Sequence, residues 1–246
     1  MILDPLAARY AHWLGLPATE TGDTADEDPS LVRAMPVILR IERSSPPPRT
    51  SVLEAAAAAA VAVCLADEPS WEDPLRAWID GRIRKVSRRA RGAHWEAVQA
   101  LPGVTVSVDG AEARALVPGL VVETPREVTR LQISGSELPT DDPGPVPPGT
   151  PILWLNPTVE MTAGKAAAQV GHASMLLAAL IRDPEHFASW KDFRCAVRTP
   201  SRAAWAALHP GDDPAGAWRS RRVVAVRDAG FTEVAPGTVT VLAQLP

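Results

Sequence analysis

The sequence predicts an α/β protein made of two halves, and three observations support this. The chain has 246 residues, 46% of them hydrophobic, which is enough for one large domain or two small ones with buried cores. Residues 139–150 are rich in proline and glycine and cannot hold a helix or a central strand, so they are expected to form a linker. Beyond this linker, short β-branched runs alternate with alanine-rich segments.

The segment after the linker is expected to begin with a strand and a long helix whose N-cap is Thr162. A second strand, a short helix capped by Ser201 and two further strands should follow. In chain order these six elements cover Ile152–Leu155, Thr162–Ile181, Phe193–Val197, Ser201–Leu208, Val223–Val226 and Val239–Leu242.

Charge and cysteine content exclude several classes of protein. Residues 1–150 carry a net charge of −6 and residues 151–246 a net charge of +2, so the C-terminal part could meet a phosphate backbone locally. Cys64 and Cys195 are too few for a disulfide framework, and no Cys/His cluster has metal-ligand spacing. No signal peptide is visible, and the longest apolar run, Ala55–Ala66, is too short to span a bilayer. We therefore expect a cytoplasmic protein without membrane, metal or cofactor.

One face of the long helix carries polar side chains of interest. Lys165, Gln169 and His172 stand at positions i, i+4 and i+7, which places them on the same face. The first turn of the helix, Met161–Lys165, would offer free N–H groups that can hold a phosphate or an oxyanion. The helix alone favours the structural interpretation, in which Lys165 is a solvated lysine and His172 a surface or core histidine.

A second stretch changes this balance. Asp228-Ala229-Gly230 directly follows a β-branched strand, at a strand-to-loop exit where functional groups often lie. The alternative is an ordinary turn in which Asp228 binds its own backbone. The segment Pro236-Gly237-Thr238 then leads into the last strand.

Together the two stretches resemble the type II (archaeal and eukaryotic-type) peptidyl-tRNA hydrolase family over residues 151–246. The first motif matches Met-x-x-Gly-Lys-x-Ala-Ala-Gln-x-x-His-Ala, and the second matches Asp-Ala-Gly-x-Thr-[Gln/Glu]-[Ile/Val]-x-x-Gly-[Ser/Thr]-x-Thr-Val-Leu. Two long motifs in the right order are hard to obtain by chance. The matching positions are Met161, Gly164, Lys165, Ala167, Ala168, Gln169, His172 and Ala173, and then Asp228 through Leu242.

The resemblance implies a small mixed sheet flanked by helices and an enzyme that cleaves the ester between a peptide and its tRNA, without a metal or cofactor. It implies that Lys165, Asp228 and Thr232 are the catalytic residues. Asp228 would orient or deprotonate water, Lys165 would stabilise negative charge, and Thr232 would bind the ester or the water. The expected contacts to substrate or tRNA come from Gly164, Gln169, His172, Thr238 and Arg227.

Three departures from the family pattern concern the RNA-facing side. Thr158 stands where an aspartate is usual, Ala163 where a lysine is frequent, and Phe231 where a basic residue is frequent. They leave two alternatives to an active hydrolase open. One is a non-catalytic module that binds tRNA or a protein, and the other is an enzyme of the same fold that cuts a different ester or amide.

The N-terminal half, residues 36–138, is similar to a degenerate copy of residues 151–246, preceded by an arm, 1–35, that is expected to be partly disordered. The copy has no Gly-Lys before its helix and no threonine after Asp109-Gly110. The chain would then be a monomeric pseudo-dimer with one active site, or a homodimer, whereas the rival interpretation is an unrelated α+β domain with a hairpin at Asp109-Gly110. The segments that pair with the C-terminal half include Pro36–Arg40, Val52–Asp67, Trp78–Asp80, Ile83-Arg84, Trp95, Val104–Asp109 and Pro118-Gly119.

The N-terminal half also contains the densest run of positive charge in the chain. We expect this run either to contact tRNA phosphates beside the C-terminal site or to be a solvated segment that offsets an acidic domain. Its members are Arg82, Arg84, Lys85, Arg88, Arg89 and Arg91.

Overall fold

The computed structural model describes residues 1–181 and 183–246. The N-terminal half forms a mixed sheet with the strand order β2-β1-β4-β3, to which β5 adds a short pairing with β1. β1 runs parallel to β2 and antiparallel to β4, and β4 runs antiparallel to β3. These strands are β1 (Arg33–Arg40), β2 (Lys85–Ala90), β3 (Gly103–Val108), β4 (Ala111–Leu116) and β5 (Gly119–Leu120).

The C-terminal half forms a second mixed sheet, with the order β7-β6-β9-β8. β6 runs parallel to β7 and antiparallel to β9, and β9 runs antiparallel to β8. The predicted mixed α/β class is therefore confirmed. These strands are β6 (Ile152–Leu155), β7 (Ala196–Arg198), β8 (Val223–Arg227) and β9 (Val239–Gln244).

The two sheets have the same strand order and the same strand directions. β1, β2, β3 and β4 of the first correspond to β6, β7, β8 and β9 of the second. The hairpin at Asp109-Gly110, expected from the rival interpretation, is also present, but it joins β3 to β4 inside this shared topology. The agreement in topology supports duplication, which remains a hypothesis about origin.

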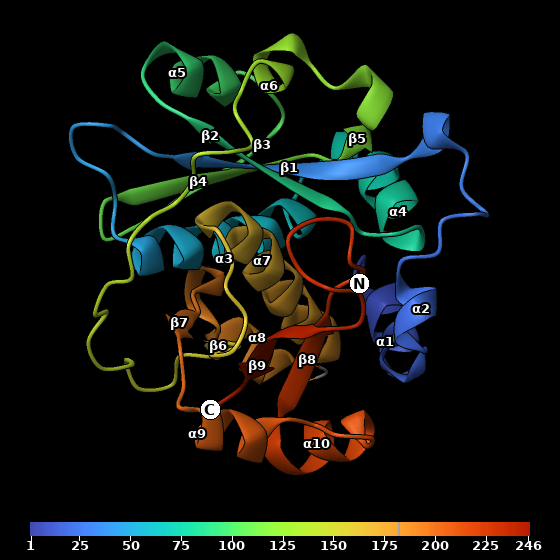
Figure 1. Ribbon diagram of the computed structural model, residues 1–246. Helices are drawn as coiled ribbons and strands as arrows, with labels where there is room; N and C mark the ends of the chain where they lie inside the picture. The colour runs from blue at the N-terminus through green and yellow to red at the C-terminus, as the bar shows by residue number, and fades with distance from the viewer. Residues whose placement is uncertain (182) are drawn as a thin grey trace.

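Helices cover both sheets in layers, as Figure 1 shows. α3 and α7 lie between the two sheets, α5 and α6 cover the outer face of the first, and α9 and α10 lie beyond the second. The longer helices are α1 (Asp4–Gly15), α3 (Arg49–Cys64), α4 (Glu72–Asp80), α5 (Ala93–Gln99), α7 (Ala163–Leu180), α8 (Pro184–Ser189), α9 (Arg202–Leu208) and α10 (Pro214–Arg221). Single turns are α2 (Ala18–Thr21), α6 (Arg126–Thr129), η1 (Pro29–Leu31), η2 (Pro69–Trp71), η3 (Val121–Glu123) and η4 (Lys191–Phe193).

The two halves share one hydrophobic core, because α3 and α7 are rich in small residues where they pack on each other. A Cβ added at Gly171 would come within 3.2 Å of the Ala60 Cβ, which shows how closely the helices approach. The Ser174 hydroxyl also donates to the Ala57 carbonyl oxygen at 2.8 Å. No single helix among the described residues is long and apolar enough to cross a membrane; α3 and residues 69–80 meet that test only as a pair bent by 97°.

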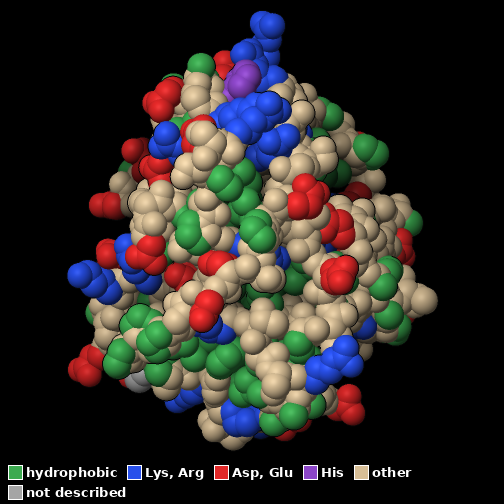
Figure 2. All heavy atoms as spheres, turned by 60° about the vertical axis from the view of Figure 1, so that its left-hand side comes forward, with side chains coloured by type: hydrophobic (Ala, Val, Ile, Leu, Met, Phe, Trp, Pro, Cys, Tyr) green, Lys and Arg blue, Asp and Glu red, His purple; other side chains and the backbone are tan. Residues whose placement is uncertain are grey.

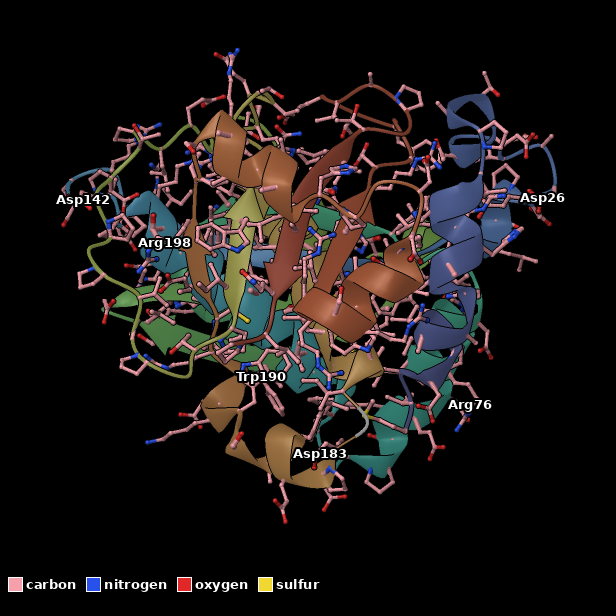
Figure 3. The ribbon with its side chains drawn as sticks, turned by 90° about the horizontal axis from the view of Figure 1, so that it is seen from below. Asp26, Arg76, Asp142, Asp183, Trp190 and Arg198 are labelled. Carbon is pink, nitrogen blue, oxygen red and sulfur yellow. The ribbon has the colours of Figure 1, made fainter. Side chains whose placement is uncertain are left out.

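The linker, residues 139–150, contains neither helix nor strand, as predicted, and it contacts both halves. Asp141 accepts hydrogen bonds from the N–H and the hydroxyl of Thr50 in the first turn of α3. Figure 3 labels Asp142 on this segment and Arg198 on β7 on the same side of the molecule. Arg198 forms an ion pair of 3.0 Å with Glu54 of α3, so this side joins linker, helix and second sheet.

The N-terminal arm, expected to be partly disordered, forms α1, α2 and η1 and packs along the free edge of β8. The Tyr10 hydroxyl accepts the N–H of Ala225 at 2.8 Å, and burial raises the pKa of Tyr10 to about 12. The acidic arm residues pair with the basic run, since Asp26 binds Arg82 and Glu27 binds Arg84. Such charge pairing orders a segment whose composition alone indicates disorder.

Two expectations about the C-terminal elements need comment. The long helix begins and ends within one residue of its predicted bounds, and Thr162 is its N-cap. The second strand was wrongly placed over Phe193–Val197, because Phe193 ends η4 with a positive φ of 54° and the strand begins only at Ala196. The turn keeps Phe193 out of the strand, and the pairing with β6 begins at Ala196, opposite Ile152.

Candidate active site

Lys165 lies in the first turn of α7, where the alanine-rich sequence favours a helix that Thr162 caps. Its Nζ donates to Asp228 Oδ2 at 2.6 Å and to Thr232 Oγ1 at 2.9 Å. The side chains of Lys165 and Asp228 are only 10% and 6% exposed, whereas Thr232 is exposed to solvent. The structure thus brings together the three residues that the sequence predicted to be catalytic.

Asp228 is held in one orientation by three donors. Its Oδ2 accepts from Lys165 Nζ and from Gln169 Nε2 at 2.8 Å, and its Oδ1 accepts the N–H of Gly230 at 2.8 Å. The Gly230 contact is the local turn expected from the alternative interpretation, and it coexists with the ion pair. Backbone hydrogen bonds between Asp228 and residues 237 and 238 close the base of the loop that joins β8 to β9.

Gln169 belongs to the interior of this network. It is 4% exposed, and its Oε1 accepts the hydroxyl proton of Thr240 at 2.5 Å, which fixes its amide with Nε2 toward Asp228. Gln169 was predicted to contact substrate or tRNA; its geometry favours positioning of Asp228 instead. Thr240 was not singled out from the sequence, although it is the last threonine of the second motif.

Glu233 connects the two motifs at the N-terminus of α7. Its carboxylate accepts the N–H of Thr162 at 3.0 Å and the Thr162 hydroxyl at 2.7 Å, and the Thr162 hydroxyl oxygen accepts the N–H of Lys165. A carboxylate at this end of a helix also interacts favourably with the helix dipole. This role was not predicted from the sequence. Two signals could have indicated it: Thr162 lies three residues before Lys165, the spacing of a helix cap, and Glu233 belongs to the second motif.

The expectation that the first turn of α7 is a free cradle for an anion is wrong. The N–H of Ala163 donates to the Ser136 carbonyl oxygen and the N–H of Gly164 to the Ser136 hydroxyl, so both donors are used. A Cβ at Gly164 would lie 2.8 Å from the Ser136 hydroxyl oxygen. Gly164 therefore permits close packing of residue 136, and its contact with substrate stays a prediction that this geometry does not favour.

His172 lies further along α7 and faces the other half of the molecule. Its Nδ1 is 3.0 Å from Nζ of Lys85, which also lies 5.1 Å from the ring centre of Trp78. Burial, together with the charges of Lys85 and Lys165, lowers the pKa of His172, and burial lowers the pKa of Lys85 to about 7. Lys85 donates to a neutral imidazole here, which makes a tRNA contact by His172 a prediction without geometric support.

The remaining predicted contacts to tRNA are Arg227 and Thr238. Both lie at the base of the loop that joins β8 to β9. The guanidinium of Arg227 donates to carbonyl oxygens of the loop and of the arm, including Gly237 at 3.1 Å and Leu14 at 3.2 Å. Thr238 accepts the N–H of Asp228 with its carbonyl oxygen at 2.8 Å. Both residues fasten the loop, and their contact with tRNA remains a prediction.

The three departures from the family pattern each have a local partner. Thr158 binds the Asn156 side chain through its N–H and its hydroxyl. Ala163 is 1% exposed beneath the segment that carries Ser136, where a longer side chain would displace that segment. Phe231 is 50% exposed, and the guanidinium of Arg84 lies 5.0 Å from its ring centre. The N-terminal half thus occupies the space around positions 163 and 231.

A surface pocket of about 830 Å³ opens beside this site. Its walls include Thr162, Ala163 and Glu233 on the catalytic side and Arg88 and Leu131 on the N-terminal half. Lys165 and Asp228 do not line the pocket, but Ala163, two residues before Lys165, and Glu233, next to Thr232, do. It gives an elongated ligand room to lie between the two halves.

At this candidate site a buried carboxylate, a lysine and an exposed threonine meet at a loop on a small mixed sheet. No group of His, Cys, Asp or Glu side chains among the described residues could hold a metal ion. Residues 152–246 match the family described as Peptidyl-tRNA hydrolase PTH2, which confirms the resemblance over this segment. At the level of the family, the match indicates peptidyl-tRNA hydrolase activity. No curated protein and no solved structure matched the chain.

Proposed function

We propose that this protein hydrolyses the ester that links a peptide, or an N-blocked amino acid, to the 3′ end of tRNA. The observation that carries the proposal is the single network in which Lys165 Nζ binds both Asp228 and Thr232, inside the segment that matches the family. The acidic N-terminal half has no such network in its corresponding loop, because only Asp109-Gly110 joins its two strands there.

Asp228 is the proposed base that orients and deprotonates the attacking water. Its Oδ2 already accepts two hydrogen bonds, whereas its Oδ1 accepts one, from Gly230. A carboxylate oxygen has two acceptor positions, so Oδ1 keeps one for water. The fixed orientation of Asp228 reduces the entropy that would be lost in placing this water against the ester.

Lys165 and Thr232 are the proposed groups that stabilise the reacting ester. A lysine ammonium has three N–H donors, and two of these bind Asp228 and Thr232, so the third can donate to the developing oxyanion. Thr232 accepts from Lys165, which leaves its own hydroxyl proton for the ester or the water. Because Thr232 is exposed and Lys165 is not, the ester would approach from the side of Thr232.

The bonds and protons balance without a covalent enzyme intermediate. The oxygen of water forms a bond to the ester carbon, and Asp228 takes one proton from that water. The carbon–oxygen bond to the ribose then breaks, and the ribose oxygen receives the proton that Asp228 took from the water, which returns Asp228 to its carboxylate form. An ester with a ribose leaving group is already activated, so positioning and charge stabilisation suffice in this proposal.

A second candidate is a non-catalytic module that binds tRNA or a protein. The observation that favours it is the occupied space around the site, where Arg84 lies on Phe231 and residue 136 lies on Ala163. At both positions the side chain contacts the protein itself, where a charged group could otherwise face RNA. An enzyme that cuts a different ester or amide would share the network of Lys165 but not turn over peptidyl-tRNA.

Single-turnover release of an N-acetylated amino acid from tRNA tests the proposal. The wild type should release it, and Asp228→Ala should slow release by about 100- to 10,000-fold, the usual contribution of a positioned base. The matched control is Asp109→Asn in the corresponding turn of the other half, where asparagine tolerates the positive φ of 48°. This control should keep the wild-type rate.

Two outcomes would reject the hydrolase. A wild type that binds tRNA without releasing the amino acid would establish the binding module instead. Equal rates for Asp228→Ala and the wild type would show that the reaction does not use this site.

A further inference from the structure

A pocket of about 270 Å³ on the N-terminal half is lined by positive side chains from separate parts of the chain. Arg43 follows β1, Arg89 and Arg91 lie at the end of β2, and Arg130 follows α6. His94, at the start of α5, completes this group, which we call the arginine pocket. Among the described residues that line it there is no aspartate or glutamate, so its charge is not balanced from within.

The arginines of this pocket have unused hydrogen-bond donors. Neither Arg43 nor Arg91 makes a side-chain hydrogen bond or an ion pair with a described residue, and Nη1 of Arg91 is buried without a partner. Buried donors without a partner are rare in proteins, since each carries the full cost of desolvation. Glu42, which precedes Arg43 in the chain, already binds Arg40 and the N–H of Gly92. An anion in the pocket would satisfy the donors that the protein leaves open.

The rest of the basic run is not available in this way. Arg82 and Arg84 pair with Asp26 and Glu27 of the arm, and Lys85 points to His172. Within the arginine pocket, Arg89 also binds the protein, since its guanidinium donates to the Ser134 carbonyl oxygen at 2.9 Å and to the Gln132 side chain. Arg91 is therefore the member of the run that lines this pocket without a side-chain hydrogen bond to a described residue. Arg43 and Arg130 line the pocket from distant positions in the sequence.

The arginine pocket adjoins the pocket beside the candidate active site. Leu131 lines both pockets, and Arg88 lines the pocket beside the candidate active site. In Figure 2, Lys and Arg side chains gather at the top of the molecule, the end where Figure 1 places α5 and α6. An extended ligand with its reacting end at Thr232 could run along the first pocket and reach the arginines.

We propose that the arginine pocket binds phosphates in the body of a tRNA whose 3′ end lies at Lys165 and Asp228. This inference rests on the proposed function, because that function supplies a polyanion whose end reacts at the site. Arginine is suited to the role since its planar guanidinium donates two parallel hydrogen bonds to a phosphate. Such contacts hold the nucleic acid in place without reading its bases.

Binding of deacylated tRNA at several salt concentrations tests the inference. The test variant is Arg43→Gln/Arg130→Gln, because both side chains are exposed and their loss should leave the fold intact. The matched control is Lys191→Gln/Arg202→Gln, which removes two exposed positive charges from the other half. The test variant should weaken binding by about tenfold and reduce the salt slope by roughly 1.4 to 1.8, the value for two lost phosphate contacts. The control should change the dissociation constant less than about twofold.

Arg91→Gln is a second test, which removes the donor that is buried without a partner. It should weaken tRNA binding as well, and its thermal unfolding should stay within a few degrees of the wild type because Arg91 makes no side-chain contact that the fold requires. Equal dissociation constants for the wild type and both test variants would overturn the inference. Equal weakening by the test variant and the control would also overturn it, since net charge alone would then explain binding.

Two further measurements distinguish tRNA binding by the arginine pocket from binding of a small anion and from the proposed hydrolase activity. Inorganic phosphate that binds the wild type as tightly as tRNA, at equal phosphate concentration, would make the pocket a small-anion site and overturn the RNA proposal. An N-acetylated aminoacyl ester of adenosine lacks the tRNA body, so Arg43→Gln/Arg130→Gln should cleave it at the wild-type rate. If the wild type cleaves neither substrate but the test variant still loses tRNA binding, the proposed function fails and the pocket stands.

Discussion

The two halves of the chain share a sheet topology but differ in the connection between their last two strands. β3 and β4 are joined by the turn Asp109-Gly110, whose φ angles of 48° and 80° suit a tight hairpin. β8 and β9 are joined by residues 228–238, which carry Asp228, Thr232 and Glu233. Figure 1 shows this loop beside α7. The two sheets therefore differ mainly in this loop, which carries the candidate site residues in the C-terminal half and is a short turn in the N-terminal half.

This comparison corrects one pairing made from the sequence. Pro118-Gly119 was matched to Pro236-Gly237, but the first follows β4 whereas the second precedes β9. The two dipeptides thus stand on opposite sides of corresponding strands. Proline and glycine are frequent in turns everywhere, so a shared dipeptide says little about position.

The central helices show a second difference between the halves. The first turn of α7 contains Gly164-Lys165, while α3 begins with Arg49, whose guanidinium donates to the Met161 carbonyl oxygen at 3.0 Å. The half without the site therefore supports the segment that leads into α7. Each half also has one enclosed lysine, Lys165 facing a carboxylate and Lys85 facing an imidazole.

Replacing each of these two lysines by methionine should give the largest difference between the halves, measured as the single-turnover rate. Lys165→Met should lower the single-turnover rate by about 100- to 1000-fold, because it removes the donor proposed for the oxyanion. Lys85→Met is the matched variant and should change that rate less than about threefold, since Lys85 touches neither Asp228 nor Thr232. Similar losses in both variants would show that the chemistry depends on the whole interface and not on the C-terminal loop.

Crowding the contact between α3 and α7 should have an intermediate effect. Ala60 is 0% exposed, and it lies so close to Gly171 that a Cβ added there would come within 3.2 Å of its own, so Ala60→Leu should lower the free energy of unfolding by about 1–3 kcal/mol. The exposed Ala206→Leu should change it by no more than about 0.5 kcal/mol.

The same experiment tests whether the halves are one unit. Denaturant unfolding followed by probes in each half should give one shared transition, because both halves contribute to a single core. Two separate transitions, with only one moved by Ala60→Leu, would contradict this and favour two independent domains.

The smallest expected effect is a pH dependence of stability that comes from Lys85. Its pKa is about 7 in the folded protein against 10.5 ordinarily, so the unfolded chain binds more protons between these values. Stability should therefore rise with pH above 7, by less than the limit of about 1.4 kcal/mol per pH unit for one proton. Chemical denaturation at pH 7.5 and 9.0 should show this rise in the wild type and a flatter response in Lys85→Met.

The window should stop near pH 9 because a thiol acts in the opposite sense above it. Burial raises the pKa of Cys64 from 9.0 to about 12, so the folded state binds more protons there and stability falls as pH rises. A wild type whose stability does not change between pH 7.5 and 9.0 would refute the assignment to Lys85.

Local pattern was sufficient for much of the C-terminal half. Thr162 and Ser201 cap helices as predicted because a cap depends on residues three positions apart. The residues predicted to be catalytic came from two motifs that resemble a known family, and their side chains meet in the structure. The predictions from sequence were wrong or incomplete where contacts between distant segments determine the structure. Ser136 fills the first turn of α7, Glu27 pairs with Arg84 and orders the arm, and Arg43 joins a pocket with Arg130.

The sequence by itself determined the α/β class and the order of the C-terminal elements, because these follow from periodicity. Its two motifs indicated Lys165, Asp228 and Thr232 as candidate site residues through their resemblance to a known family. Only the tertiary structure decided that both sheets share one topology around a single core, that Gln169 and Thr240 orient Asp228, and which arginines remain open to a ligand. The physical reason is that burial, charge pairing and hydrogen-bond satisfaction depend on neighbours brought together from far along the chain.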